Sequence, residues 1–192
     1  LGASGHRLVC HLLPSLLSVH DTSTIAGARN QAILLVFLTT GLRVSELCEL
    51  KKNNIVGQDS FEVVGKGLKT RTVFLSNKAK TAIDAYLGFR TDSDPYLFIR
   101  HDAPSKYTGP LNARLATVAI ASIVKRAAIK AGIPYNIHPH TLRHTYTTNL
   151  LSSGANILLV QKLLGHASLA TTQIYAHVTN DELKAAHEKA FA

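Results

Sequence analysis

The stretch TGLRVSEL at residues 40–47 lies where a long apolar segment gives way to charged side chains. In residues 25–40, which precede the charged part, apolar side chains recur three and four apart, as in an amphipathic helix packed on a core. Gly41 stands just past this run, where helices commonly end on a left-handed residue. We therefore expect a helix over residues 25–40 that stops at Gly41, with Arg43 and Glu46 on the turn that follows.

Arg43 and Glu46 are three residues apart, so they share one face if this turn is helical. An arginine suits a phosphate because its planar guanidinium donates two hydrogen bonds and stays charged, and a nearby carboxylate can hold it in place. The pair indicates an anion site with an adjacent carboxylate. An ordinary ion pair on a helix surface has the same spacing, and this segment taken alone slightly favours it.

Helical spacing recurs along most of the chain, and glycines follow several of the helical runs. Residues 55–75 differ, because short β-prone runs alternate there with the turns GQD and GKGLK. Lys66 and Lys69 lie on the second turn, where they could approach a phosphodiester or simply be solvated. The sequence predicts a mainly α fold with a small three-stranded antiparallel β-sheet. Further helices are expected over residues 76–90, 113–131, 141–152, 157–164 and 181–191, and strands over 54–56, 61–64 and 71–74.

A second cluster, HPHTLRH at residues 138–144, places His140 and Arg143 on one helical face. A proton carrier would then lie beside a phosphate binder. His140 and His144 also have the spacing of zinc-binding helices. Thr141, however, stands where the H-E-x-x-H motif has glutamate, so we expect no metal site.

A third cluster, LGHASLATTQIYAH, covers residues 164–177. Gly165 ends one expected helix, His166 lies at the junction, and Tyr175 lies at the far end of the next helix. Taken alone, His166 is more often a capping histidine and Tyr175 a packed aromatic than a catalytic group.

Composition favours a basic protein with one core. The chain has 192 residues, and 21 Lys and Arg against 12 Asp and Glu give a net charge of +9, which makes nucleic acid the first partner to consider. A merely soluble basic protein is the alternative. Without a long apolar span or a secretory signal, we expect a soluble, cytoplasmic protein. Because the sequence contains no methionine, we also expect it to be part of a longer chain.

In order and wording, these clusters resemble the signature of the tyrosine recombinase, or phage integrase, family. The motifs that carry the resemblance are TGLRVSEL, V-G-K-G-x-K-x-R at residues 64–71, H-x-L-R-H at 140–144 and L-G-H-x-S…T-x-x-Y at 164–175. The resemblance runs from about residue 28 to the C-terminus. It implies one catalytic domain over residues 1–192 and a separate N-terminal core-binding domain, which we expect to be absent from this sequence.

The resemblance implies a site that cleaves and rejoins DNA strands. Arg43 and Arg143 would hold the scissile phosphate, with Glu46 supporting the first arginine. Lys66 would donate a proton to the leaving 5′ oxygen, and His140 would act in acid/base catalysis.

Tyr175 would be the nucleophile and form a 3′-phosphotyrosyl link, and His166 would hydrogen-bond the phosphate. Lys69 and Arg71 are expected to contact DNA. Two arginines can stabilise the transferring phosphoryl group without a divalent ion, so no cofactor is expected. Two rival functions remain. One is a type IB topoisomerase-like nicking and closing enzyme, and the other is a DNA-binding module with vestigial catalytic residues, which the full set of catalytic residue types argues against.

The expected partner is double-stranded DNA. The resemblance implies a homotetramer on paired sites, while the free chain could be a monomer. Residues 180–192 have near-helical apolar spacing and would form a tail helix that packs on its own core or is exchanged between protomers. No contact with a membrane is expected.

Overall fold

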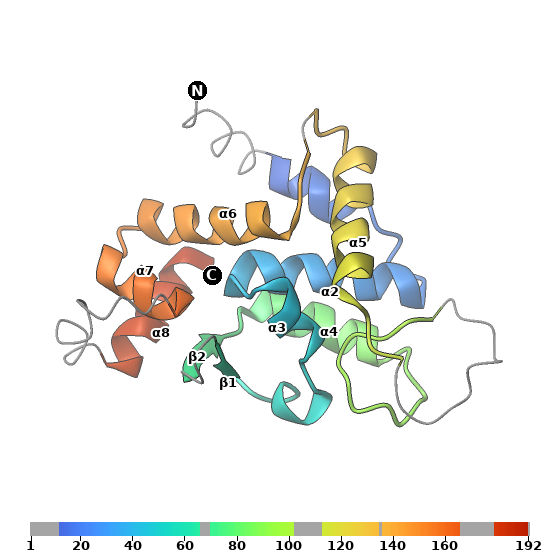
Figure 1. Cartoon of the computed structure of the whole chain (residues 1–192), viewed down its shortest axis with the longest axis horizontal. Helices are drawn as coiled ribbons and strands as arrows, with labels where there is room; N and C mark the ends of the chain where they lie inside the picture. Colours follow the sequence, from blue (N-terminus) through green and yellow to red (C-terminus); the bar gives the residue numbers. More distant parts are fainter. Residues whose placement is uncertain (1–11, 66–69, 102–112, 135, 166–178, 192) are drawn as a thin grey trace.

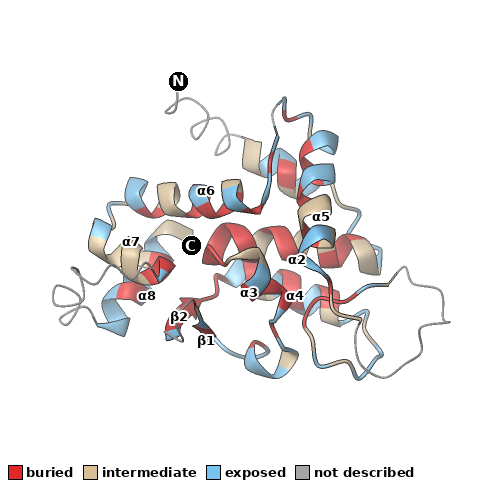
Figure 2. Ribbon diagram, in the orientation of Figure 1, coloured by how far each residue is buried: buried red, intermediate tan, exposed pale blue. Residues whose placement is uncertain are grey.

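Helix α2, Ile25–Thr40, lies at the centre of the molecule, and helices α4, α5 and α6 pack on it (Figure 1). Most of its side chains are buried, including Ile33 and Phe37 (Figure 2). The helix begins after Thr24, whose side chain accepts a hydrogen bond from the Gly27 N–H. It ends at Gly41, which has a φ of 61°. The expected limits of this helix are therefore confirmed.

The computed structural model describes residues 12–65, 70–101, 113–134, 136–165 and 179–191. Residues 12–18 are helical and precede α2. The remaining elements, in chain order, are α3 Val44–Cys48, the 3₁₀ turn η1 Lys52–Asn54, β1 Ser60–Val64, β2 Thr70–Phe74, α4 Asn77–Leu87, α5 Thr117–Lys130, α6 Pro139–Ser152, α7 Ile157–Leu164 and α8 Asn180–Phe191. None of these helices is both long enough and apolar enough to cross a membrane.

All six helices that the sequence predicts within the described residues are found in the predicted order, and two of them are shorter than expected. The helix at residues 12–18 was not predicted. Ser76 is the cap of α4 rather than its first residue, because its Oγ accepts a hydrogen bond from the Ala79 N–H. Residues 113–115 are extended instead of helical, because Arg114 forms an antiparallel bridge with Ile99. The helix α5 therefore begins only at Thr117.

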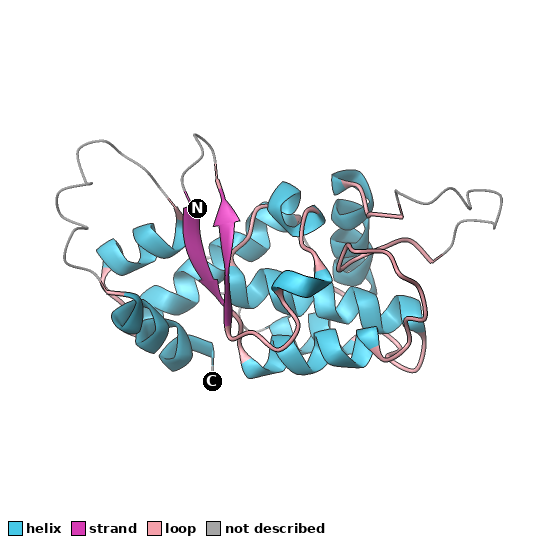
Figure 3. Cartoon of the chain, turned by 90° about the horizontal axis from the view of Figure 1, so that it is seen from below, coloured by secondary structure: helices cyan, strands magenta, loops and turns pink. Residues whose placement is uncertain are grey.

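The sheet has two strands in the described part of the chain, β1 and β2, which pair antiparallel with Phe61 opposite Val73 (Figure 3). The prediction of a third strand over residues 54–56 was wrong. Residues 52–54 form the η1 turn, in which the Ile55 N–H donates to the Lys52 carbonyl at 3.0 Å. Paired asparagines disfavour a strand, and the turn still buries Ile55 in the core.

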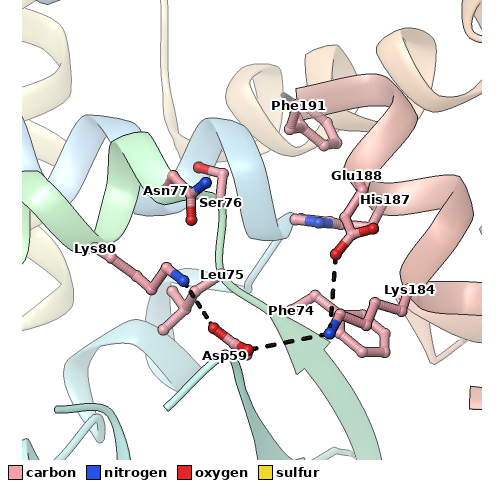
Figure 4. Close-up of a pocket in the computed structure, with 10 residues that line it drawn as sticks. All are labelled: Asp59, Phe74, Leu75, Ser76, Asn77, Lys80, Lys184, His187, Glu188 and Phe191. Atoms are coloured by element: carbon pink, nitrogen blue, oxygen red, sulfur yellow. Dashed lines mark hydrogen bonds and ion pairs between the residues drawn. The ribbon is translucent and has the colours of Figure 1, made fainter. Parts of the chain in front are cut away.

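Helix α8 packs on the same chain, against α6, α7 and β2. Its Leu183 joins a small apolar core, and its buried His187 donates a hydrogen bond from Nε2 to the Thr39 carbonyl at 2.6 Å. Nearby, a cavity of about 410 Å³ lies between α8, β2 and the start of α4 (Figure 4). Asp59 lies at its edge, 2.7 Å from the Lys80 Nζ and 4.0 Å from the Lys184 Nζ. Exchange of this tail between protomers stays a prediction.

Candidate functional site

Arg43 and Glu46 are held together at the start of α3. The Arg43 backbone N–H donates to Glu46 Oε2 at 2.7 Å, and its Nη1 donates to Oε1 at 3.1 Å. The Glu46 side chain is only 7% exposed, whereas that of Arg43 is 37% exposed. Because the carboxylate is buried, this is not an ordinary surface ion pair. The Arg43 guanidinium is therefore held by Glu46 through Nη1 while its side chain stays partly exposed.

Arg71 approaches the same carboxylate from β2. Its Nη1 and Nη2 donate to Glu46 Oε1 and Oε2 at 2.8 and 2.6 Å, in the two-pronged geometry that suits arginine and carboxylate. The residue is buried, and its Nε has no hydrogen-bond partner among the described residues. Arg71 therefore ties the hairpin to α3 through Glu46.

Arg143 connects the ends of two helices. From α6, its Nη1 donates to the Gly41 carbonyl just past the end of α2, and its Nη2 donates to the Leu164 carbonyl of α7 at 2.8 Å. Carbonyls at helix C-termini lack helical donors and carry partial negative charge, so they stabilise a cation. Arg143 itself is buried.

The charges in this cluster are unbalanced, with the three guanidinium groups of Arg43, Arg71 and Arg143 around one carboxylate. Burial acts to raise the pKa of Glu46, but hydrogen bonds from Arg71 and Arg43 outweigh it and hold the pKa at about 2. Burial, followed by repulsion from Arg43 and Arg71, lowers the pKa of Arg143 to about 10. At neutral pH the Glu46 carboxylate and the Arg143 guanidinium are therefore both charged. Three arginines around one carboxylate suit an anion such as phosphate.

His140 lies on the first turn of α6, three residues before Arg143, and its side chain is exposed. Its ring centroid is 6.2 Å from that of His138. Within the described ranges, no three His, Cys, Asp or Glu side chains gather as metal ligands. His140 therefore lies on the same helix as Arg143 and is accessible from solvent.

The structure brings four of the expected site residues into one cluster: Arg43, Glu46, Arg71 and Arg143. The elements that carry them, α3, β2 and α6, meet at one end of α2, where α7 also ends (Figure 1). A fifth expected residue, His140, lies on α6, but within the described residues no hydrogen bond joins its side chain to this cluster. The remaining four, Lys66, Lys69, His166 and Tyr175, lie outside the described residues. Their roles stay predictions.

Comparison with known proteins identifies the family. Residues 7–182 match the family model described as the phage integrase family. The chain belongs to the phage integrase family. Tyrosine recombinase XerC of Bacillus licheniformis is 40% identical over 181 residues, which cover 90% of this chain and 57% of the relative. The chain thus spans little more than half the length of that relative.

Solved structures agree with this assignment to the phage integrase family. The crystal structure of XerA recombinase matches with a TM-score of 0.67 and 31% identity over 96% of this chain and 62% of that chain. XerH site-specific recombinase bound to its difH substrate matches with a TM-score of 0.66 and 25% identity over 92% and 52%. The sequence-based identification of the family is confirmed.

The sequence interpretation missed how this phage integrase family site is held together. It assigned Arg71 only to DNA binding, although Arg71 and Val73 are two residues apart in β2 and so share one, buried face of the strand. This spacing indicates that Arg71 is buried together with Val73, and a buried arginine needs a carboxylate partner. The two backbone carbonyls that accept hydrogen bonds from Arg143 left no signal in the sequence, because every residue has a backbone carbonyl.

Proposed function

We propose that the chain is the catalytic domain of a site-specific DNA recombinase, which cleaves and rejoins strands through a 3′-phosphotyrosyl intermediate. The supporting observation is the arginine cluster around Glu46, in a chain of the phage integrase family whose relatives are named tyrosine recombinases. Arg43 remains partly open, so a phosphate can reach it.

In the proposed reaction, the residues act mainly by electrostatic stabilisation of the transferring phosphoryl group. In the cleavage step, the Tyr175 oxygen bonds to phosphorus while the bond from phosphorus to the 5′ oxygen breaks. Arg43 and Arg143 offset the negative charge that builds on the non-bridging oxygens. His140 accepts the proton that the Tyr175 hydroxyl loses, and Lys66 gives its own proton to the leaving oxygen. His166 donates a hydrogen bond to the phosphate.

Rejoining follows from the same step in reverse. A tyrosine hydroxyl, with an unperturbed pKa of about 10, needs nearby cations and a base to become a nucleophile. Once formed, the phosphotyrosyl bond retains the energy of the broken phosphodiester. A free 5′-hydroxyl from the partner strand can therefore attack it without ATP.

The proposed partner is double-stranded DNA, in line with the DNA-bound XerH recombinase that this chain resembles. Positive charge supports this assignment, since the whole chain carries +9. Lys69 would add a contact from the hairpin turn. We further propose a homotetramer on paired sites, in which the tail helix is exchanged between protomers. The free chain would be a monomer with the tail packed on its own core, as observed. The proposed location is the cytoplasm, on the nucleoid.

Strand exchange distinguishes this function from its rivals. The chain would be incubated with two labelled duplexes that carry candidate element ends, and separately with a supercoiled plasmid that lacks them. We expect recombinant duplexes and no relaxation of the plasmid. Relaxation of any plasmid without exchange would favour the topoisomerase-like enzyme, and binding without either reaction would favour the vestigial module.

A further inference from the structure

Glu46 is shared between a partly exposed arginine, Arg43, and a buried one, Arg71. Its Oε1 accepts from Arg43 Nη1 at 3.1 Å and from Arg71 Nη1 at 2.8 Å. Its Oε2 accepts from the Arg43 backbone N–H at 2.7 Å and from Arg71 Nη2 at 2.6 Å. The two parallel bonds from Arg71 fix the plane of the carboxylate, and that plane sets the direction in which Arg43 is held.

Arg71 also changes the net charge of the group formed by Arg43 and Glu46. If Arg43 were the only partner of the buried Glu46, the two would form a neutral pair, and the negative charge of Glu46 would offset most of the attraction of Arg43 for an anion. With Arg71 bound to both oxygens, the three groups together keep a net positive charge. Because the Arg71 side chain is only 6% exposed, solvent screens this effect weakly.

The same side chain contacts the segment that ends α7. A Cβ added at Gly165 would lie 2.9 Å from Arg71 Cδ, so the arginine packs directly on this glycine. Gly165 follows Leu164, whose carbonyl binds Arg143, and precedes His166 in the sequence. Arg71 therefore contacts two of the three sequence clusters and belongs to the strand that leaves the turn containing Lys66.

We propose that Arg71 is a positioning residue for strand cleavage, which orients Arg43 through Glu46 and fixes the turn at Gly165, rather than a residue that binds DNA. This proposal rests on the proposed function. It assigns Arg71 a role in the rate of the chemical step and little role in DNA affinity, since both of its terminal nitrogens are bound to Glu46.

Two variants test the role. Arg71→Lys keeps the charge but cannot make the two-pronged contact, and Arg71→Leu removes the charge while filling much of the volume. The control is Arg90→Lys, because the Arg90 side chain is 2% exposed and is paired with Asp92 away from the site. Each variant would be compared with wild type in single-turnover cleavage of a saturating nicked duplex, in DNA affinity and in urea unfolding.

We expect Arg71→Lys to lower the cleavage rate of the folded protein at saturating DNA by about 10- to 100-fold, since small misplacements of a catalytic group cost that much. Arg71→Leu should lower it further. DNA affinity should change little, and Arg90→Lys should lose stability without losing rate. If Arg71→Leu does not fold, Arg71→Lys decides the matter.

Other outcomes separate the alternatives. Weaker DNA binding with a reduced salt dependence and an unchanged saturating rate would show that Arg71 contacts DNA, and would overturn the proposal. Lost stability with an unchanged rate would show a purely structural role and would overturn it as well. A wild-type chain that cleaves no DNA would instead overturn the proposed function on which this inference depends.

Discussion

Gly41 shows how one residue can serve both the fold and the site. Its φ of 61° ends α2, and its carbonyl receives Arg143. The glycine also lies under an aromatic ring, because a Cβ placed there would be 2.3 Å from Tyr146 Cδ1. The local backbone and the close packing therefore both require glycine at this position.

Replacing Gly41 should therefore be costly. We expect Gly41→Ala to destabilise the fold by about 1–2 kcal/mol through its left-handed backbone and by a further ~1–3 kcal/mol through crowding against Tyr146. Gly57→Ala is the matched control, because Gly57 has a φ of 73° and open space around its Cβ position. Urea unfolding measures both, and equal losses would contradict the crowding at Gly41.

At this scale, the sequence predicted which residue types matter better than it predicted their partners. The spacing of Arg43 and Glu46 correctly placed them on one turn. Nothing in that spacing shows that Arg71, 25 residues away, binds the same carboxylate. Periodicity tells which face of an element a side chain occupies, but not which distant element covers it.

Among the elements, α8 depends on a buried histidine. Its His187 donates to the carbonyl of Thr39 near the end of α2 and packs among Phe74, Tyr146 and Phe191. Burial lowers the pKa of His187, although the bond to Thr39 and the charge of Glu188 oppose this. The attachment of the tail is therefore sensitive to acid.

The sign of this pH effect follows from linkage. An unfolded histidine takes up a proton near its reference pKa of 6.5, whereas folded His187 does so only at lower pH. The stability that neutral His187 contributes is complete above pH 6.5 and is lost as the pH falls below it. We expect wild type to lose more unfolding free energy between pH 7.5 and 5.5, values about one unit on either side of the reference, than His187→Gln does.

The glutamine variant keeps a side-chain N–H donor but does not titrate, so the difference between the two curves isolates His187. His20, whose pKa is also lowered by burial, contributes equally to both curves. Parallel curves for wild type and variant, measured by urea unfolding across this range, would contradict the prediction.

The hairpin shows where element prediction failed. Strands β1 and β2 were correctly expected from their β-branched and aromatic residues. The β-branched residues Ile55 and Val56 favour a strand at 54–56, yet two asparagines precede them and the chain turns there. Short apolar runs of this kind are ambiguous without knowledge of the surrounding packing.

Across the whole molecule, the site depends on contacts between segments far apart in the sequence. Arg143 binds Gly41, which is 102 residues away, and Leu164, which is 21 residues away. The order of helices was predictable from glycines and periodicity, and the family from four ordered motifs. The packing that aligns the ends of α2 and α7 around Arg143 was not, because it depends on the complete core.

We propose that Tyr175 attacks the DNA phosphate with the help of the arginine cluster. The most direct measurement is detection of a covalent protein–DNA adduct on denaturing gels, with nicked suicide duplexes in EDTA. Wild type should form the adduct, and Tyr175→Phe, which lacks only the hydroxyl, should form none. An adduct that persists in Tyr175→Phe would contradict the role of Tyr175 as nucleophile, and an adduct that wild type forms only with an added divalent metal would contradict metal-independent cleavage.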